Sequence, residues 1–243
     1  MLSHDMRNNS KKLLASVITS ILFTIFAVSF FSIDDLKADA QSANATNYSF
    51  EPFQSLQGST YQDIPDSDSL NLTEFSLASW FRTSPNYTEP GHIVNKGGMN
   101  TDEQGMNLNY GLWINEENGV AGGFEAESGE DYILASSDKF NDGNWHYVVL
   151  TFNGTSLFLY VDGKLQGNLT SIEEVPDQTG DQPLRIGANS LNEDKFFTGD
   201  VDEIRVWNRG LNMSEVENSY GNNKFNTTGQ KLFLSYGDYV NSK

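Results

Sequence analysis

The chain has 243 residues, of which 33 are Asp or Glu and 15 are Lys or Arg, so its formal net charge is −18. This excess of negative charge argues against a nucleic-acid partner, because neutralising phosphates requires a basic surface. The chain has no cysteine, which excludes disulfides, cysteine-ligated metal centres and cysteine nucleophiles.

The first 40 residues have the pattern of an export signal. Basic residues precede an uncharged apolar run, Leu13–Phe31, and the small-x-small sequence Ala-Asp-Ala follows at 38–40. As a helix the run is about 28 Å long, close to the thickness of a bilayer core. Residues 1–40 are therefore predicted to be either a signal peptide, cleaved before Gln41, or an uncleaved membrane anchor. Both place the rest of the chain outside the cell, secreted or tethered to the outer face of the membrane.

One domain is predicted for residues 48–240, after a flexible tether at 41–47. Asn-x-Ser/Thr sequons indicate N-glycosylation of the exported part. The alternative is that Asn-rich loops generate sequons through composition alone. The sequons begin at Asn44, Asn47, Asn71, Asn86, Asn153, Asn168, Asn212 and Asn226.

Short segments rich in β-branched and aromatic residues recur along the chain between Gly, Asn and Asp, which predicts an all-β domain. The strands expected before residue 140 lie at 61–64, 75–82, 92–96, 110–114, 120–124 and 132–135.

The clearest pattern follows at residues 145–166. The pairs Asn153-Gly154 and Asp162-Gly163 supply the positive φ angles that tight hairpins require. These residues are therefore predicted to form an antiparallel meander of three strands. Farther along, an Asn at 212 and a Glu at 215 form a capping box, which predicts one short helix. The remaining strands are expected at 184–186, 197–207 and 232–236.

Several segments carry a family resemblance through their sequences and their order. They are FSLASWFRT (75–83), HIVNKG (92–97), YGLWI (110–114), NDGNWHYVVLTFNG (141–154), LFLYVDGKL (157–165), LRIG (184–187) and FTGDVDEIRVWNRGLNMSEV (197–216). Together they resemble the laminin-G-like domains of the concanavalin A-like superfamily, to which the pentraxins also belong. The resemblance implies an all-β jelly-roll sandwich of two antiparallel sheets with one short C-terminal helix.

The resemblance also implies a function at the cell surface. We expect an extracellular, non-catalytic module that binds glycans or cell-surface proteins. Two alternatives stay open, a structural component of the cell envelope and a degenerate glycoside hydrolase, because one fold serves many functions.

Residues 199–207 bear on the hydrolase alternative, because they resemble the Glu-x-Asp-x-x-Glu signature of laminarinase-type glycoside hydrolases. Strand alternation would place Asp200 and Asp202 on one face and Glu203 on the other. Arg205 stands where the family has its proton donor, and a permanent cation cannot donate that proton. We therefore expect no catalytic residue in this segment and no enzymatic activity.

Calcium is the cofactor that this acidic sequence favours, because the ion takes about six to eight oxygen ligands, many of them carboxylates. In the superfamily an Asp after the Gly of the late strand often helps to hold a structural calcium. Asp202 is the matching position here. The alternative is that Asp202 accepts hydrogen bonds from nearby backbone amides.

Carbohydrate recognition requires aromatic rings beside amide side chains. Tyr110, Trp113 and Asn115 combine both in one segment and are the predicted ligand-binding residues. The alternative is that aromatic residues at strand spacing belong to the core. Only His92 and His146 follow the N-terminal segment, too few for a three-histidine zinc site, and His146 is expected to be structural.

Overall fold

Two antiparallel β-sheets and one α-helix dominate the part of the chain that the computed structural model describes, residues 53–98, 105–192 and 194–236. The predicted signal or anchor and the tether lie outside these ranges. None of the described helices is long and apolar enough to cross a membrane. The elements are β1 (Gln54–Gln57), β2 (Gln62–Ile64), η1 (Asp68–Leu70), β3 (Phe75–Arg82), β4 (Gly91–Lys96), β5 (Tyr110–Ile114), β6 (Gly119–Glu125), β7 (Asp131–Lys139), β8 (His146–Phe152), β9 (Ser156–Val161), β10 (Lys164–Thr170), β11 (Leu184–Ile186), β12 (Thr198–Trp207), α3 (Met213–Asn222) and β13 (Gln230–Leu234).

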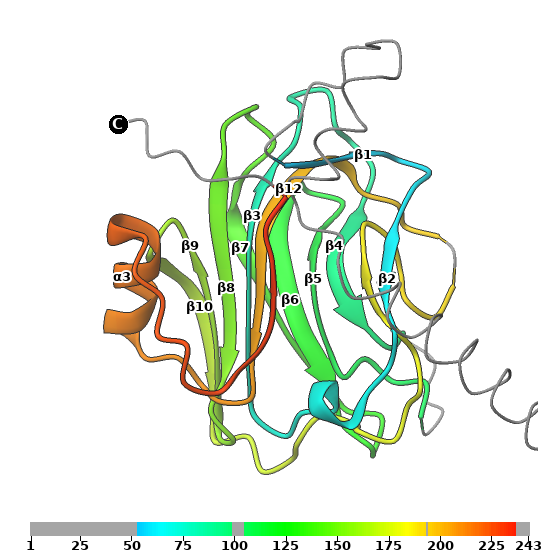
Figure 1. Ribbon diagram of the computed structural model, residues 1–243, viewed down its shortest axis with the longest axis vertical. Coiled ribbons are helices and arrows are strands. Elements are labelled where there is room, and N and C mark those ends of the chain that lie inside the picture. The colour runs from blue at the N-terminus through cyan, green and yellow to red at the C-terminus, as the bar shows by residue number, and fades with distance from the viewer. Residues whose placement is uncertain (1–52, 99–104, 193, 237–243) are drawn as a thin grey trace, which may run out of the picture. The chain divides into compact units, whose positions relative to one another are not determined.

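The strands form a seven-stranded sheet A and a six-stranded sheet B. Sheet A has the order β1-β12-β3-β8-β9-β10, with β13 also paired to β12, and sheet B has the order β2-β11-β4-β5-β6-β7. All the pairings within the sheets are antiparallel. Figure 1 shows the two layers, with α3 lying beside β9 and β10. The predicted jelly-roll sandwich is confirmed.

Every predicted strand is present, although some ends differ. The meander is confirmed as β8, β9 and β10, and its turns hold Gly154 at φ 90° and Asp162 at φ 52°. Strand β1 was not predicted, because only Leu56 of its four side chains is buried. Its pairing with residues 198–201 of β12 makes it a strand. This pairing is a tertiary contact that no local sequence pattern indicates.

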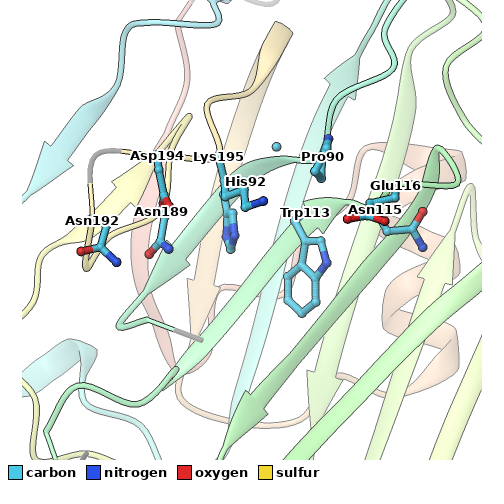
Figure 2. A pocket seen from close by; sticks show the side chains of 10 residues that line it. Pro90, His92, Trp113, Asn115, Glu116, Asn189, Asn192, Asp194 and Lys195 are labelled. Atoms are coloured by element: carbon cyan, nitrogen blue, oxygen red, sulfur yellow. The ribbon is translucent and has the colours of Figure 1, made fainter. Parts of the chain in front are cut away.

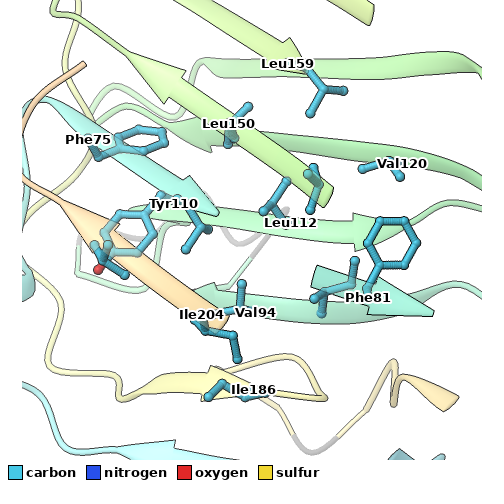
Figure 3. Close-up of a cluster of buried hydrophobic side chains, with 14 of the residues drawn as sticks. Phe75, Phe81, Val94, Tyr110, Leu112, Val120, Leu150, Leu159, Ile186 and Ile204 are labelled. Carbon is cyan, nitrogen blue, oxygen red and sulfur yellow. The ribbon is translucent and has the colours of Figure 1, made fainter. Parts of the chain in front are cut away.

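Side chains that point inward from both sheets form one hydrophobic core between them (Figure 3). The rings of Phe124 and Phe152 lie 4.7 Å apart between centroids, and Phe75 lies 5.3 Å from Tyr110. Tyr110 is fully buried, and its hydroxyl donates a hydrogen bond to the Leu70 carbonyl at 3.0 Å. Aromatic pairs at these separations add to the stability gained from burial alone.

The predicted helix is confirmed as α3, together with its capping box. The Asn212 side chain accepts a hydrogen bond from the Glu215 amide at 3.1 Å, and the Glu215 carboxylate accepts one from the Asn212 amide at 3.0 Å. Val216 of the helix is buried against Tyr147 and Trp207 on the outer face of sheet A. The helix α3 therefore covers the outer face of sheet A and does not cover the outer face of sheet B.

A charged clamp joins three segments at one end of β8. His146 Nδ1 lies 2.8 Å from Asp162 Oδ2, and its Nε2 lies 3.0 Å from Asp142 Oδ1. The imidazole packs against Phe140 and Phe81. Burial opposes protonation, but the hydrogen bonds to both carboxylates outweigh it, so the pKa of His146 lies above its ordinary value of 6.5. The structural role expected for His146 fits this placement.

The clamp predicts a pH-dependent stability. Because the folded pKa of His146 is raised, its stabilising contribution is complete below the unfolded value near 6.5 and is lost as the pH rises through the folded pKa. We expect His146→Gln to lower the free energy of unfolding by about 1.5–3 kcal/mol at pH 5.5, the usual worth of hydrogen bonds to charged groups. Thermal melts from pH 5.5 to 8.5 check this.

The difference in Tm between wild type and His146→Gln should shrink as the pH rises. The His92 imidazole, whose pKa is lowered to about 4, is present in both proteins, so its own effect on the pH dependence of stability cancels in this difference. A constant difference across the range would contradict the clamp.

Candidate functional site

The segment that resembles the hydrolase signature is buried rather than exposed to substrate. Strand β12 bulges there, since its register with β3 shifts between Asp202 and Arg205 and Glu203 has a left-handed φ of 48°. The Arg205 guanidinium lies between the Phe225 and Phe233 rings, 3.6 and 3.7 Å from their centroids. The expected strict alternation of side chains is therefore wrong at Glu203, because the bulge adds a residue to the strand.

The acidic side chains of this segment are already engaged. Asp200 Oδ2 lies 2.7 Å from Arg82 Nη2, and Glu203 Oε2 lies 3.5 Å from Arg205 Nη2. Burial raises the pKa of Glu203, although Arg205 opposes the shift. Retaining glycoside hydrolysis needs two carboxyl groups about 5 Å apart at an accessible surface. In this segment Asp202 and Glu203 are buried and Asp200 is ion-paired with Arg82.

Asp202, the predicted calcium ligand, contacts the backbone. Its Oδ1 accepts hydrogen bonds from the Glu203 amide at 2.7 Å and from the Tyr236 amide at 3.1 Å. Burial raises its pKa, while these two amides and Arg205 lower it. Among the described residues, no group of three or more His, Asp or Glu side chains is arranged to hold a metal ion. The contacts that the structure shows for Asp202 are those of a backbone acceptor, and calcium binding stays a prediction from sequence.

These contacts predict how Asp202 affects stability. Asp202→Ala leaves two amides without their acceptor, so we expect a loss of about 1–3 kcal/mol in the free energy of unfolding. The loss should be equal in millimolar calcium and in sodium chloride of the same ionic strength, as measured by thermal melts. A gain in Tm that is specific for calcium and disappears in Asp202→Ala would contradict this.

The structure divides the three predicted ligand-binding residues. The prediction is wrong for Tyr110, because alternation along β5 directs its side chain into the core, where it is fully buried. Trp113 and Asn115 lie at the end of β5 and in the turn after it, and both line a pocket. Whether they bind a ligand stays a prediction.

This pocket has a volume of about 370 Å³ and lies at one end of sheet B. Figure 2 shows the side chains of the loop between β11 and β12 on one side, those of the β5–β6 turn on the other, and His92 and Trp113 between them. The lining residues are Pro90, Gly91, His92, Trp113, Asn115, Glu116, Asn189, Asn192, Asp194 and Lys195.

Backbone hydrogen bonds hold the loop between β11 and β12 against β4. The His92 amide donates to the Lys195 carbonyl at 2.9 Å, and the Asn189 amide donates to the Asp194 carbonyl at 3.0 Å. A side chain at Gly91 would lie 2.7 Å from the Phe196 carbonyl oxygen, so only glycine permits this approach. Hydrogen bonds and a close approach of the backbone thus join this wall of the pocket to β4.

His92 is the buried floor of the pocket. Its ring stacks on Trp113, with centroids 5.7 Å apart and planes at 29°. Burial and the nearby Lys195 ammonium lower the pKa of His92 to about 4, so the imidazole is neutral at physiological pH. The side chain is 6% exposed, and its Nδ1 has no hydrogen-bond partner in the described part of the chain. A buried polar atom in this state is rare in folded proteins.

Two asparagines of the pocket have their carbonyl oxygens occupied. Asn115 Oδ1 accepts hydrogen bonds from the Gly119 amide at 2.9 Å and from the Glu117 amide at 3.0 Å. Asn189 Oδ1 accepts one from the Leu191 amide at 3.0 Å. Each side chain is thereby oriented by its own turn, and its Nδ2 group is the part left to donate.

No sequon asparagine of the described chain is a lining residue of this pocket. Those at Asn86, Asn153, Asn168, Asn212 and Asn226 are exposed, whereas Asn71 is half-buried. None of them lies in a described strand of sheet B or in the loop between β11 and β12. Asn44 and Asn47 fall outside the described residues, and glycosylation stays a prediction.

Most lining residues of the pocket were not predicted as ligand-binding residues, among them His92, Asn189, Asp194 and Lys195. The latter three come from a short polar loop whose composition resembles that of any other loop in this chain. The signal that could have marked His92 is its place in an apolar strand, which is equally typical of a structural residue.

Three comparisons with known proteins bear on the family. A family model of laminin G type, described as the concanavalin A-like lectin/glucanases superfamily, matches residues 56–217. No curated protein matches the sequence.

Solved structures with a similar fold include binding proteins. The CBM40 module of the Ruminococcus gnavus IT-sialidase, bound to α2,3 sialyllactose, is 15% identical with a TM-score of 0.57, over 70% of this chain and 97% of that one. The heptameric SAP-like pentraxin from Limulus polyphemus is 14% identical with a TM-score of 0.53, over 76% and 91%. The binding domain of Paraclostridial Mosquitocidal Protein 1 is 17% identical with a TM-score of 0.51, over 70% and 46%. At these identities the likeness shows the fold alone.

Proposed function

We propose, from the premise that this chain belongs to the concanavalin A-like lectin/glucanases superfamily, that it is an extracellular, non-catalytic module that binds glycans in the pocket of sheet B. The observation that carries the proposal is the polar, unsatisfied His92 at the floor of a pocket lined by an indole and several amides. Glycan sites combine apolar rings with a few placed polar groups in this way.

The chemistry of the pocket supports a ligand rich in hydroxyl groups. One face of the Trp113 indole is covered by His92 and the residue is buried, so a ligand would not stack on an open ring. Hydrogen bonding from amide and indole N–H groups would then contribute more to recognition than stacking. The printed description of the CBM40 module, bound to sialyllactose, supports a glycan as the ligand class.

The position of the pocket also favours recognition of an external ligand. It lies on sheet B, whereas α3 covers the outer face of sheet A. The exposed sequons are outside the strands of sheet B and are not lining residues of the pocket. The predicted export signal or anchor would place this surface outside the cell, where glycans of the envelope or of other cells are found.

Binding should depend on Trp113. We expect the purified full chain to bind members of a glycan array, and Trp113→Ala to weaken that binding at least tenfold, because the variant removes the indole edge and the support of His92. Fluorescence titration measures the affinity. Trp145→Ala is the matched control, since it removes an indole that contacts Phe53 and Arg82 outside the pocket.

Circular dichroism and thermal melts must first show that both variants are folded. Equal affinity in wild type and Trp113→Ala would contradict the assignment of the pocket. Failure of the wild type to bind any glycan would favour the structural role in the cell envelope, and turnover of β-glucans would favour a hydrolase.

A further inference from the structure

The charged groups of the pocket are mainly acidic. Glu116 and Asp194 line it together with one cation, Lys195. Lys195 makes no ion pair with a described carboxylate, since the ion pairs of the described chain involve other residues. A ligand that carries a negative charge therefore approaches an unfavourable potential.

The uncharged polar groups supply hydrogen-bond donors as well as acceptors. The Nδ2 groups of Asn115 and Asn189 can donate, because backbone amides occupy their carbonyl oxygens. The two carboxylates accept, and the neutral His92 can do either through its unpartnered Nδ1, depending on its tautomer. Donors and acceptors thus lie around one volume of about 370 Å³.

We infer that the pocket selects neutral, polyhydroxylated sugars and discriminates against sugars that carry a carboxylate. A hydroxyl group donates and accepts at once, so it can satisfy a carboxylate and an amide N–H group together. A ligand carboxylate can only accept hydrogen bonds. Near Glu116 and Asp194 it would face other acceptors with no proton to share, and the like charges would repel one another. This inference rests on the proposed glycan-binding function and specifies its substrate class.

The experiment compares matched pairs of monosaccharides with the full chain: glucose with glucuronic acid, galactose with galacturonic acid, and mannose with mannuronic acid. Within each pair the sugars differ at the carboxylate carbon alone. Nuclear magnetic resonance titration follows the Trp113 indole N–H and gives the Kd. We expect at least one neutral sugar to bind at least tenfold more tightly than its acidic counterpart at physiological salt.

A double variant, Glu116→Gln with Asp194→Asn, tests the cause. It should weaken binding of the neutral sugar and strengthen binding of the acid, so that the ratio of the two Kd values falls at least fivefold. The matched control is Asp68→Asn with Glu217→Gln, which removes the same two charges from exposed positions outside the pocket. The control should leave the ratio within about twofold of that of the wild type, because distant surface charges are screened by salt.

Each remaining outcome has one meaning. Equal or tighter binding of the acidic member of every pair that binds overturns the inference and leaves the glycan-binding proposal standing. The same fall in the ratio with both double variants overturns the assignment of selectivity to Glu116 and Asp194. The absence of binding by any sugar of the panel overturns the inference together with the proposed function.

Discussion

The antiparallel pairing of β12 with β3 is the interaction on which most of this structure depends. It joins residues 200–207 to residues 76–82, and the other edge of β12 holds both β1 and β13. Three segments that are far apart in the chain therefore become neighbours through one strand. The bulge at Glu203 lets this strand keep Val201 and Ile204 in the core while Arg205 packs outside it.

The same strand decides which face of the sandwich can bind a ligand. The chain that leaves β12 forms α3 and covers the outer face of sheet A. The loop between β11 and β12 crosses the end of sheet B. Hydrogen bonds to β4 hold it there, and it forms one wall of the pocket. One face is thus closed by apolar packing, and a polar pocket forms on the other.

Polar groups have contrasting roles on the two faces. On β12 the carboxylates and Arg205 contact one another or the backbone, as expected of buried charges, which are costly unless they are paired. Buried polar atoms without a hydrogen-bond partner occur on both faces, among them Arg205 Nε on β12 and His92 Nδ1, and His92 is a lining residue of the pocket. An unsatisfied buried group weakens a fold, and beside a pocket such a group can be satisfied by a water, an ion or a ligand.

The sequence by itself determined every strand except β1, together with the meander, the capped helix and the family, because these follow from local alternation, turn residues and the order of segments. It also placed Trp113 and Asn115 together, since only one residue separates them. Tertiary structure decided the rest. Burial of Tyr110 depends on which face of β5 meets the core, and His92 meets Lys195 only because residues about 100 positions apart are hydrogen-bonded across the loop before β12. Local sequence carries no signal for contacts of that range.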